Sequence, residues 1–270
     1  MLNVSIVLYR TPASEVQKIV STLRLSAVVD EIWLIDNSEI QTEAYMFLPA
    51  TYIFNNKNLG YGAAHNIAIR KSLASGAKYH LVINSDISFK PEILKILIDY
   101  LDINEEVGQL MPLVRYPSGE IQYLAKLLPT PYDLIIRRFL PACVTHKRTS
   151  KYELHNIPLD RPSNIAYLSG CFMMFRCSAL QQIGLFDERY FMYPEDIDIT
   201  RRVHKQFRTE FYPLEEIVHN HAQSSYKNYK MLRIHIINIC RYFNKWGWIF
   251  DRERKEINRQ ICDKINDERE

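Results

Sequence analysis

Acidic side chains follow two short apolar runs of this sequence. Asp36 ends the run 31–35, and Asn84-Ser85-Asp86 follows the run 79–83. A carboxylate at the carboxyl end of a buried strand can hold Mg²⁺ or Mn²⁺ between itself and a diphosphate. An aspartate that only caps the following helix is the alternative interpretation of Asp86. The segment by itself therefore leaves both a metal motif and a helix cap open.

A glycine-containing segment, Asn58 to Asn66, opens a predicted helix. Two of the eight glycines of the chain, Gly60 and Gly62, lie in it. Glycine lets a backbone approach a ligand closely, and a helix N-terminus offers free amide groups to an anion. A tight turn that packs small residues is the alternative. The segment has neither the lysine of a phosphate-binding P-loop nor the G-x-G-x-x-G spacing of a dinucleotide-binding turn, so both classes are excluded.

Three carboxylates within four residues, Glu195, Asp196 and Asp198, begin a later predicted helix. The helix dipole favours anions there, but ordinary capping accounts for one or two acids more readily than for three. Further on, His219 and His221 are alternate residues of an extended segment, so both imidazoles can face one site as metal ligands. Structural histidines at a strand end are the alternative. The string His-Asn-His also names a nuclease motif, of which no other part is present.

Short strands that alternate with helices would bring these residues together. Such alternation predicts an α/β fold with a doubly wound, mostly parallel sheet, in which ligands bind beyond the carboxyl ends of the strands. His65 and His204 are expected on helices or at the surface, without a partner. The expected strands are 3–8, 31–35, 51–54, 79–83, 107–115, 165–175 and 209–212, and the expected helices are 13–25, 63–73, 92–101, 132–140, 178–183 and 196–207.

Composition excludes several classes of protein. The 270 residues are 47% hydrophobic and 24% charged, which is typical of globular chains and not of disordered or fibrous ones. A net charge of +3 is too small to indicate nucleic acid as the main partner. Five cysteines without a C-x-x-C pair fit neither a zinc cage nor a disulfide framework. No signal peptide or membrane span is visible, so we expect a cytoplasmic protein, peripheral at most on the inner face of the cell membrane.

In this order the motifs resemble the inverting glycosyltransferases of family 2, which have the nucleotide-sugar-binding GT-A fold. An asparagine that opens the metal motif, a Leu-Pro-x-Pro segment before paired arginines (128–138) and a Tyr-Phe-x-Lys-Trp-Gly stretch (242–247) resemble bacterial rhamnosyltransferases. The segments that carry the family resemblance are Val4 to Tyr9, 33–38, Asn58 to Asn66, Asn84 to Asp86, 169–172, 186–198 and His219 to Ser225.

The resemblance implies a role for each candidate residue. Asp196 would be the catalytic base, Asp36 would accept a base N–H of the nucleotide, and Asp86 would bind Mg²⁺ or Mn²⁺. Asn84 departs from the Asp-x-Asp form, which leaves one carboxylate ligand fewer. The implied donor-binding residues are Tyr9, Asp36, Asn58, Gly60, Tyr61, Gly62, Asn66, Asn84, Ser85 and Asp86. The implied acceptor-binding residues are Gly170, Tyr193, Glu195 and Asp198, and the implied metal ligands are Asp86, His219 and His221.

The resemblance also implies partners and a division of the chain. The expected reaction moves L-rhamnose from dTDP-L-rhamnose to a lipid-linked glycan in surface-polysaccharide synthesis, for O-antigen or capsule. A UDP-hexose donor is one alternative, and a non-catalytic module that binds a nucleotide sugar or a glycan is another. We expect a GT-A catalytic domain over residues 1–222 and a helical, basic tail over 223–270. Within the domain, 1–100 would bind the nucleotide sugar and 101–222 the acceptor, with a loop-rich insertion at about 129–162.

The tail combines basic charge with an apolar stripe. Residues 227–259 contain nine basic and three acidic side chains. A helix of this composition could lie on an anionic membrane surface. A helix packed on the catalytic domain, with a solvated basic face, needs the same stripe and is the alternative. The stripe residues are Leu232, Ile236, Ile239, Tyr242 and Phe243, followed by Trp246 and Trp248.

Overall fold

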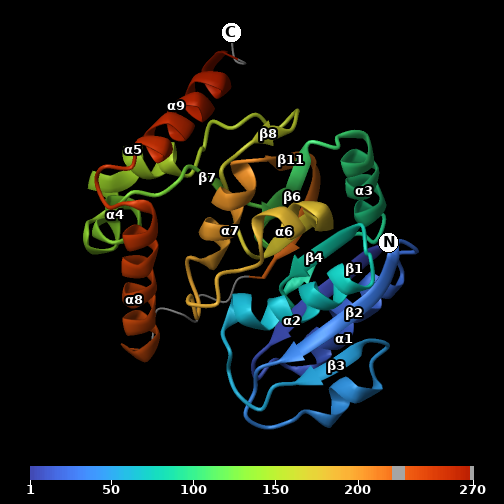
Figure 1. The fold of residues 1–270 in the computed structure, drawn as a ribbon. Coiled ribbons are helices and arrows are strands. Elements are labelled where there is room, and N and C mark those ends of the chain that lie inside the picture. The colour runs from blue at the N-terminus through green and yellow to red at the C-terminus, as the bar shows by residue number, and fades with distance from the viewer. Residues whose placement is uncertain (221–228, 268–270) are drawn as a thin grey trace.

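The computed structural model describes residues 1–220 and 229–267, which form a central mixed sheet covered by helices on both faces (Figure 1). The strand order is β3-β2-β1-β4-β10-β6-β11-β5, and β8 pairs with β11. The strands of this sheet are β1 (Leu2–Leu8), β2 (Val29–Asp36), β3 (Thr51–Phe54), β4 (Tyr79–Ile83), β5 (Ile87–Ser88), β6 (Val107–Arg115), β8 (Ser163–Asn164), β10 (Phe172–Arg176) and β11 (Arg208–His219). The predicted α/β class with a mostly parallel sheet is confirmed.

Helices lie against both faces of the sheet and at its far end. They are α1 (Ala13–Arg24), α2 (Tyr61–Ala74), α3 (Ile93–Ile103), α4 (Pro131–Leu134), α5 (Ala142–Tyr152), α6 (Cys177–Ile183), α7 (Glu195–His204), α8 (Tyr229–Trp246) and α9 (Arg252–Asp267), with short 3₁₀ helices η1 (Glu43–Phe47) and η2 (Ile136–Phe139). A separate two-stranded sheet joins β7 (Ala125–Lys126) to β9 (Tyr167–Leu168).

Alternate side chains of the central strands supply two separate cores. Leu81 and Ile83 of β4 pack with α1 and α3, whereas Val82 between them packs with α2, α6 and α7. Strands buried on both faces appear as continuous apolar runs in a sequence, because neither face needs polar residues. This is why the runs that end at Asp36 and before Asn84 could be assigned to strands.

The four parallel strands β3, β2, β1 and β4 end at one edge of the sheet. Leu8 of β1 is in register with Asp36 of β2, and Asp36 with Phe54 of β3. Segments that follow these strands therefore meet at that edge, as expected for a sheet of this type. The edge places the site described below.

Two segments differ from the predicted elements. The run 165–175, predicted as one strand, is divided into β9 and β10 by a turn at Ser169 and Gly170. In the predicted loop-rich insertion at 129–162, the two short helices α4 and η2 lie where a single helix was predicted over 132–140. A further helix, α5, follows them and was not predicted. Apolar periodicity alone does not reveal the first difference, because both pieces of the run are buried.

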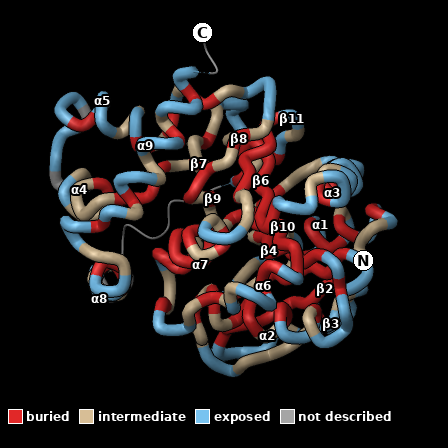
Figure 2. The backbone as a smooth tube through the Cα atoms, turned by 45° about the horizontal axis from the view of Figure 1, so that its top comes forward, coloured by how far each residue is buried: buried red, intermediate tan, exposed pale blue. Residues whose placement is uncertain are grey.

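The C-terminal helices share a hydrophobic cluster with strands β6, β7, β9 and β11. Ile239, Tyr242 and Phe243 of α8 are buried with Ile261 and Ile265 of α9 in a further hydrophobic cluster (Figure 2). Three of the five stripe residues are thus used for packing, which fits the alternative of a helix packed on the domain, whereas Leu232 and Ile236 are exposed. In the described part of the chain, no helix combines the length and apolar character that a membrane crossing requires.

Candidate functional site

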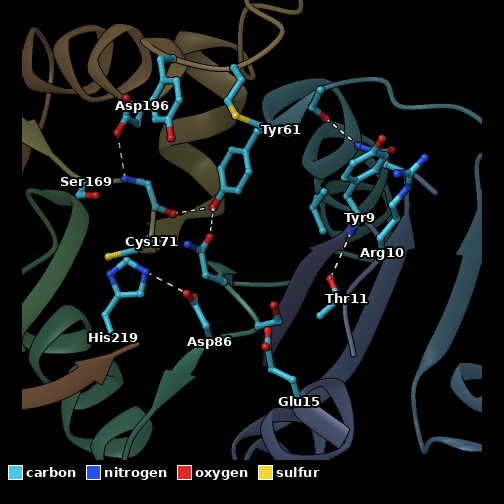
Figure 3. A pocket seen from close by; sticks show the side chains of 18 of the residues that line it. Tyr9, Arg10, Thr11, Glu15, Tyr61, Asp86, Ser169, Cys171, Asp196 and His219 are labelled. Carbon is cyan, nitrogen blue, oxygen red and sulfur yellow. Dashed lines mark hydrogen bonds and ion pairs between the residues drawn. The ribbon is translucent and has the colours of Figure 1, made fainter. Parts of the chain in front are cut away.

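A cavity of about 710 Å³ opens at the carboxyl ends of the parallel strands (Figure 3). The loops after β1, β2 and β4 form one side, and the turn between β9 and β10 and the start of α7 form the other. The predicted site residues that line it are Tyr9, Asn58, Gly60, Tyr61, Asn84, Ser85, Asp86, Gly170, Tyr193, Glu195, Asp196 and His219. Asp36, Gly62, Asn66 and Asp198 are not in the lining, and His221 lies outside the described residues.

Asp86 and His219 face each other at one end of the cavity. The imidazole Nε2 lies 3.4 Å from Asp86 Oδ1. Gln122 fixes the ring of His219. The Gln122 amide nitrogen donates to the His219 carbonyl at 2.8 Å, and the Gln122 amide oxygen therefore faces Nδ1 of the ring at 3.0 Å. Nδ1–H is then the donor, and Nε2 faces Asp86. An imidazole nitrogen beside a carboxylate is a ligand arrangement for a divalent cation.

The residues present at this end fit a divalent cation as a partial ligand set. Asp86 Oδ1 is buried and accepts no hydrogen bond from the described residues. Within residues 1–220 and 229–267 there is no group of three or more His, Cys, Asp or Glu side chains around one point. Asp86 and His219 would therefore hold the ion together with ligands from outside this chain, such as diphosphate oxygens. When bound, such an ion neutralises charge on a departing diphosphate.

Glu195 and Asp196 lie at the opposite end, at the start of α7. Asp196 Oδ2 accepts hydrogen bonds from the Gly170 amide at 3.1 Å and the Tyr167 hydroxyl at 3.4 Å, and Oδ1 accepts one from the Ile197 amide at 2.8 Å. Burial raises the pKa of Asp196, and burial together with the Asp196 charge raises the pKa of Glu195 to about 8. Three hydrogen-bond donors to the Asp196 carboxylate oppose the effect of burial on its pKa and favour its ionised form.

Tyr61 connects the two ends of the cavity. Its hydroxyl lies 2.6 Å from the Gly170 carbonyl oxygen and 3.0 Å from Asn84 Oδ1 (Figure 3). The amide of the same Gly170 donates to Asp196. Asn84, which replaces the first acid of an Asp-x-Asp motif, is thus held against the turn that positions Asp196.

The glycines of the 58–66 segment allow close packing against the loop before α7. Gly60 has φ +88°, and a Cβ there would lie 2.2 Å from the Phe191 carbonyl oxygen. That oxygen accepts the Tyr61 amide at 2.9 Å, so the first amide of α2 already has a partner. Gly62 is packed against Phe186 in the same way. The alternative of a tight turn explains both glycines, and their role in donor binding stays a prediction.

Three predicted site residues have partners inside the protein. Asp36 is fully buried, and its carboxylate accepts the Ser38 amide at 2.9 Å and the Tyr52 hydroxyl at 2.7 Å. Asn66 is hydrogen-bonded to both backbone groups of Phe186. Asp198 is buried among Arg202, Lys245 and Trp246. Their roles toward substrates stay predictions, whereas their roles in holding the loops around the cavity are direct contacts.

Sequence analysis missed several residues that line the cavity. Asn37 reaches it directly after Asp36 and donates to the Gly60 carbonyl at 3.1 Å. His65, expected on a helix or at the surface and without a partner, lies on α2 behind the lining, where it is fully buried and hydrogen-bonded to Ser5 Oγ at 2.7 Å. Most of the other missed lining residues follow the end of a strand, which is the signal that could have identified them. These are Arg10, Thr11, Pro12, Glu15, Ser169, Cys171, Met192 and Asn220.

The raised pKa of Glu195 predicts a pH-dependent stability. Because the folded state holds this proton up to about pH 8, the stabilisation is complete below the ordinary Glu range and is lost as the pH rises toward 8. As the pH rises toward 8, the unfolding free energy of the unmodified chain should fall by at most about 1.4 kcal/mol per pH unit through this group. Glu195→Gln should lack this fall. Urea unfolding between about pH 5 and 8 measures it, with Glu105→Gln on the surface as the control. Equal slopes in Glu195→Gln and the unmodified chain would contradict the assignment.

The sheet with its helices on both faces is a GT-A glycosyltransferase fold, and its cavity has a carboxylate and a histidine at one end and a buried acid pair at the other. The chain belongs to glycosyl transferase family 2, because the model of that family matches residues 4–184. The mannosyltransferase PcManGT from Pyrobaculum calidifontis, solved with GDP-Man and Mn²⁺, shares this fold with a TM-score of 0.57. The match covers 90% of this chain and 63% of that protein at 14% identity.

Two curated relatives are named as rhamnosyltransferases. The N-acetylglucosaminyl-diphospho-decaprenol L-rhamnosyltransferase of Mycobacterium tuberculosis is 32% identical over an alignment of 182 residues, and the match covers 62% of this chain and 58% of the relative. Rhamnosyltransferase WbbL of Escherichia coli K12 is 26% identical over an alignment of 207 residues, and the match covers 74% of this chain and 75% of the relative. The chain thus spans little more than half the length of the mycobacterial protein and about three quarters of WbbL.

Proposed function

We propose that this protein is an inverting glycosyltransferase that moves L-rhamnose from dTDP-L-rhamnose to a lipid-linked glycan during surface-polysaccharide synthesis. The observation that carries the proposal is one cavity with Asp86 and His219, 3.4 Å apart, at one end and Asp196 at the other. The names of two relatives support rhamnose as the sugar, and the name of the mycobacterial one supports a lipid diphosphate acceptor.

Asp196 acts as the base in the proposed reaction. Its carboxylate takes the proton of the acceptor hydroxyl as that oxygen attacks the anomeric carbon, while the bond to the diphosphate breaks on the opposite side and configuration is inverted. Burial raises the pKa of Asp196, which makes it a stronger base than an exposed aspartate. Glu195, whose pKa is raised to about 8, can donate a hydrogen bond from its protonated carboxyl to an acceptor oxygen.

The side chains on the other side of the cavity bind the donor in this proposal. Tyr9 is exposed there and presents a ring face on which a nucleobase can stack. Asn58 and Asn84 offer amide groups to ribose and diphosphate. A UDP-hexose donor remains the alternative within the family, because thymine and uracil present the same hydrogen-bonding edge.

A thermal-shift screen with nucleotide sugars tests the donor. A ligand that binds only the folded state at a hundred times its Kd stabilises by about 2.7 kcal/mol. We expect dTDP-L-rhamnose with Mn²⁺ to raise the unfolding temperature more than UDP-glucose, UDP-galactose or UDP-N-acetylglucosamine does. Transfer to a polyprenyl-diphosphate N-acetylglucosamine acceptor is then followed by mass spectrometry. A stabilising donor without any transfer would favour the non-catalytic module, and a larger shift with a UDP sugar would favour the other donor class.

A further inference from the structure

Three consecutive apolar residues, Trp248, Ile249 and Phe250, are exposed in the turn between α8 and α9. We call these three residues the aromatic turn. Ile249 is 69% exposed and Phe250 90%. The Trp248 ring packs on Phe243, with ring centroids 5.2 Å apart, so its outer edge alone reaches the surface. Adjacent exposed apolar side chains on a folded domain mark a contact surface more often than scattered ones do.

Buried polar contacts hold the aromatic turn in place. Arg254 is buried and donates to the Trp248 carbonyl at 3.0 Å and to the Pro129 carbonyl at 3.3 Å. Asp251, which follows the turn, accepts both terminal nitrogens of buried Arg201, at 2.8 and 2.9 Å. These hydrogen bonds fix the backbone on both sides of Ile249 and Phe250, and the fixed backbone keeps the two side chains exposed.

Basic residues and further exposed apolar side chains lie on the elements beside the turn. Helices α4, α5, α8 and α9 share one side of the molecule in both views (Figures 1 and 2). Residues 129–152 contain five basic side chains and one acidic side chain. The exposed basic residues of α5 and of the start of α9 are Lys147, Arg148, Lys151, Arg252 and Lys255, with Glu256 as an exposed acid of the same stretch of α9. The exposed apolar residues of η2 and α5 with the linker between them are Ile136, Leu140 and Val144.

We propose that the aromatic turn inserts into the surface of an anionic lipid bilayer, with the basic residues of α5 and α9 against the lipid headgroups. Apolar tips bury in the acyl boundary, a tryptophan edge suits the interface, and each lysine or arginine near the surface adds electrostatic attraction. Positive flanks complement a negative membrane, whereas they would repel a second copy of the same face. The proposed membrane contact is thus the aromatic turn and not the apolar stripe of α8, most of which is buried.

The aromatic turn is also connected to the candidate base. Arg201, which binds Asp251, lies on α7, the helix that begins with Glu195 and Asp196. A bilayer contact at the turn would thus fix the height of the cavity above the membrane. This inference rests on the proposed function, since an acceptor anchored by its lipid holds its sugar at a set distance from the bilayer.

Vesicle flotation of the full chain tests the proposal with a matched pair of double variants. The turn variant is Ile249→Ser with Phe250→Ser. The control is Ile103→Ser with Phe47→Ser, which removes an isoleucine and a phenylalanine that are 81% and 86% exposed elsewhere. On vesicles of phosphatidylcholine and phosphatidylglycerol, we expect the turn variant to bind at least about tenfold more weakly than the unmodified chain and the control to bind unchanged.

Lipid composition and salt supply the second arm. Binding should be weaker on phosphatidylcholine alone and should fall as ionic strength rises, because charges beyond a Debye length are screened. Equal binding by the turn variant and the unmodified chain, or no binding to either vesicle, would overturn the proposal. A dimer in sedimentation that only the turn variant disperses would assign the face to a second copy instead.

A soluble acceptor separates this result from the proposed function. With N-acetylglucosamine diphosphate on a short alkyl chain, transfer by the turn variant should equal that of the unmodified chain, because neither substituted residue lines the cavity. Loss of vesicle binding with intact transfer supports the membrane contact. Absence of transfer in the unmodified chain would reject the proposed function and leave the vesicle result to stand separately.

Discussion

Replacement of Asp196 by asparagine is expected to lower kcat at least about a hundredfold and to leave donor affinity nearly unchanged. The amide keeps the shape of the carboxylate and can still accept from the Gly170 and Ile197 amides, but it cannot take a proton. Single-turnover transfer and calorimetric donor titration measure the two quantities separately. Loss of the acidic limb of the pH–rate profile should accompany the loss of rate, since burial places the pKa of Asp196 above the ordinary Asp range.

Asp198→Asn is the contrast for this variant. Asp198 begins the same helix two residues later, but its carboxylate is buried against Arg202 and Lys245 and does not line the cavity. Its replacement should therefore lower the unfolding temperature before it lowers the rate of the folded enzyme. If Asp196→Asn kept most of its activity, Asp196 would not be the base, whereas loss of rate in folded Asp198→Asn would support the predicted role of Asp198 toward the acceptor.

Replacement of Asp86 by alanine should weaken donor binding at least about tenfold in the presence of Mn²⁺ and abolish the response to the ion. Asp86 Oδ1 is buried, faces His219 Nε2 at 3.4 Å and accepts no hydrogen bond from the described residues, so a cation is the charge it is placed to receive. Calorimetry of dTDP binding with Mn²⁺ and with chelator measures both effects.

His219→Gln is the companion variant, because it removes the imidazole and leaves Asp86 in place. A reduced but measurable Mn²⁺ response is expected from it. Ser88→Ala, on the neighbouring strand β5 and away from the cavity lining, serves as the control. Donor affinity that is the same with and without metal in the unmodified chain would show that Asp86 and His219 do not form a cation site.

The central strands could be predicted because their signal is local. Strands β3, β4 and β6 begin and end where the apolar runs predicted. A strand that is buried on both faces needs apolar residues throughout, and the polar residue after it marks the carboxyl edge where loops collect. Asp86 and His219 could be selected from the chain on this basis, and Asp196 from the cluster of acids at a helix start, although the three are far apart in sequence.

The partners of each polar group depended on contacts between distant segments. Nothing near Asp36 in the sequence shows that Tyr52 would occupy its carboxylate, and nothing near Gly60 shows that the Phe191 carbonyl would lie against it. The turn at Gly170 was hidden inside an apolar run, yet it supplies the amide that holds Asp196.

The sequence by itself determined the class of fold, the order of the motifs and the residue types available at the strand ends. Only the tertiary structure decided which of these residues line the cavity, that Glu195 is buried beside Asp196 and retains its proton to about pH 8, and that the apolar stripe of α8 packs inward while Ile249 and Phe250 remain exposed. The reason is physical. Periodicity and strand ends follow from neighbours along the chain, whereas burial, pKa and exposure depend on which distant segments fold against a residue.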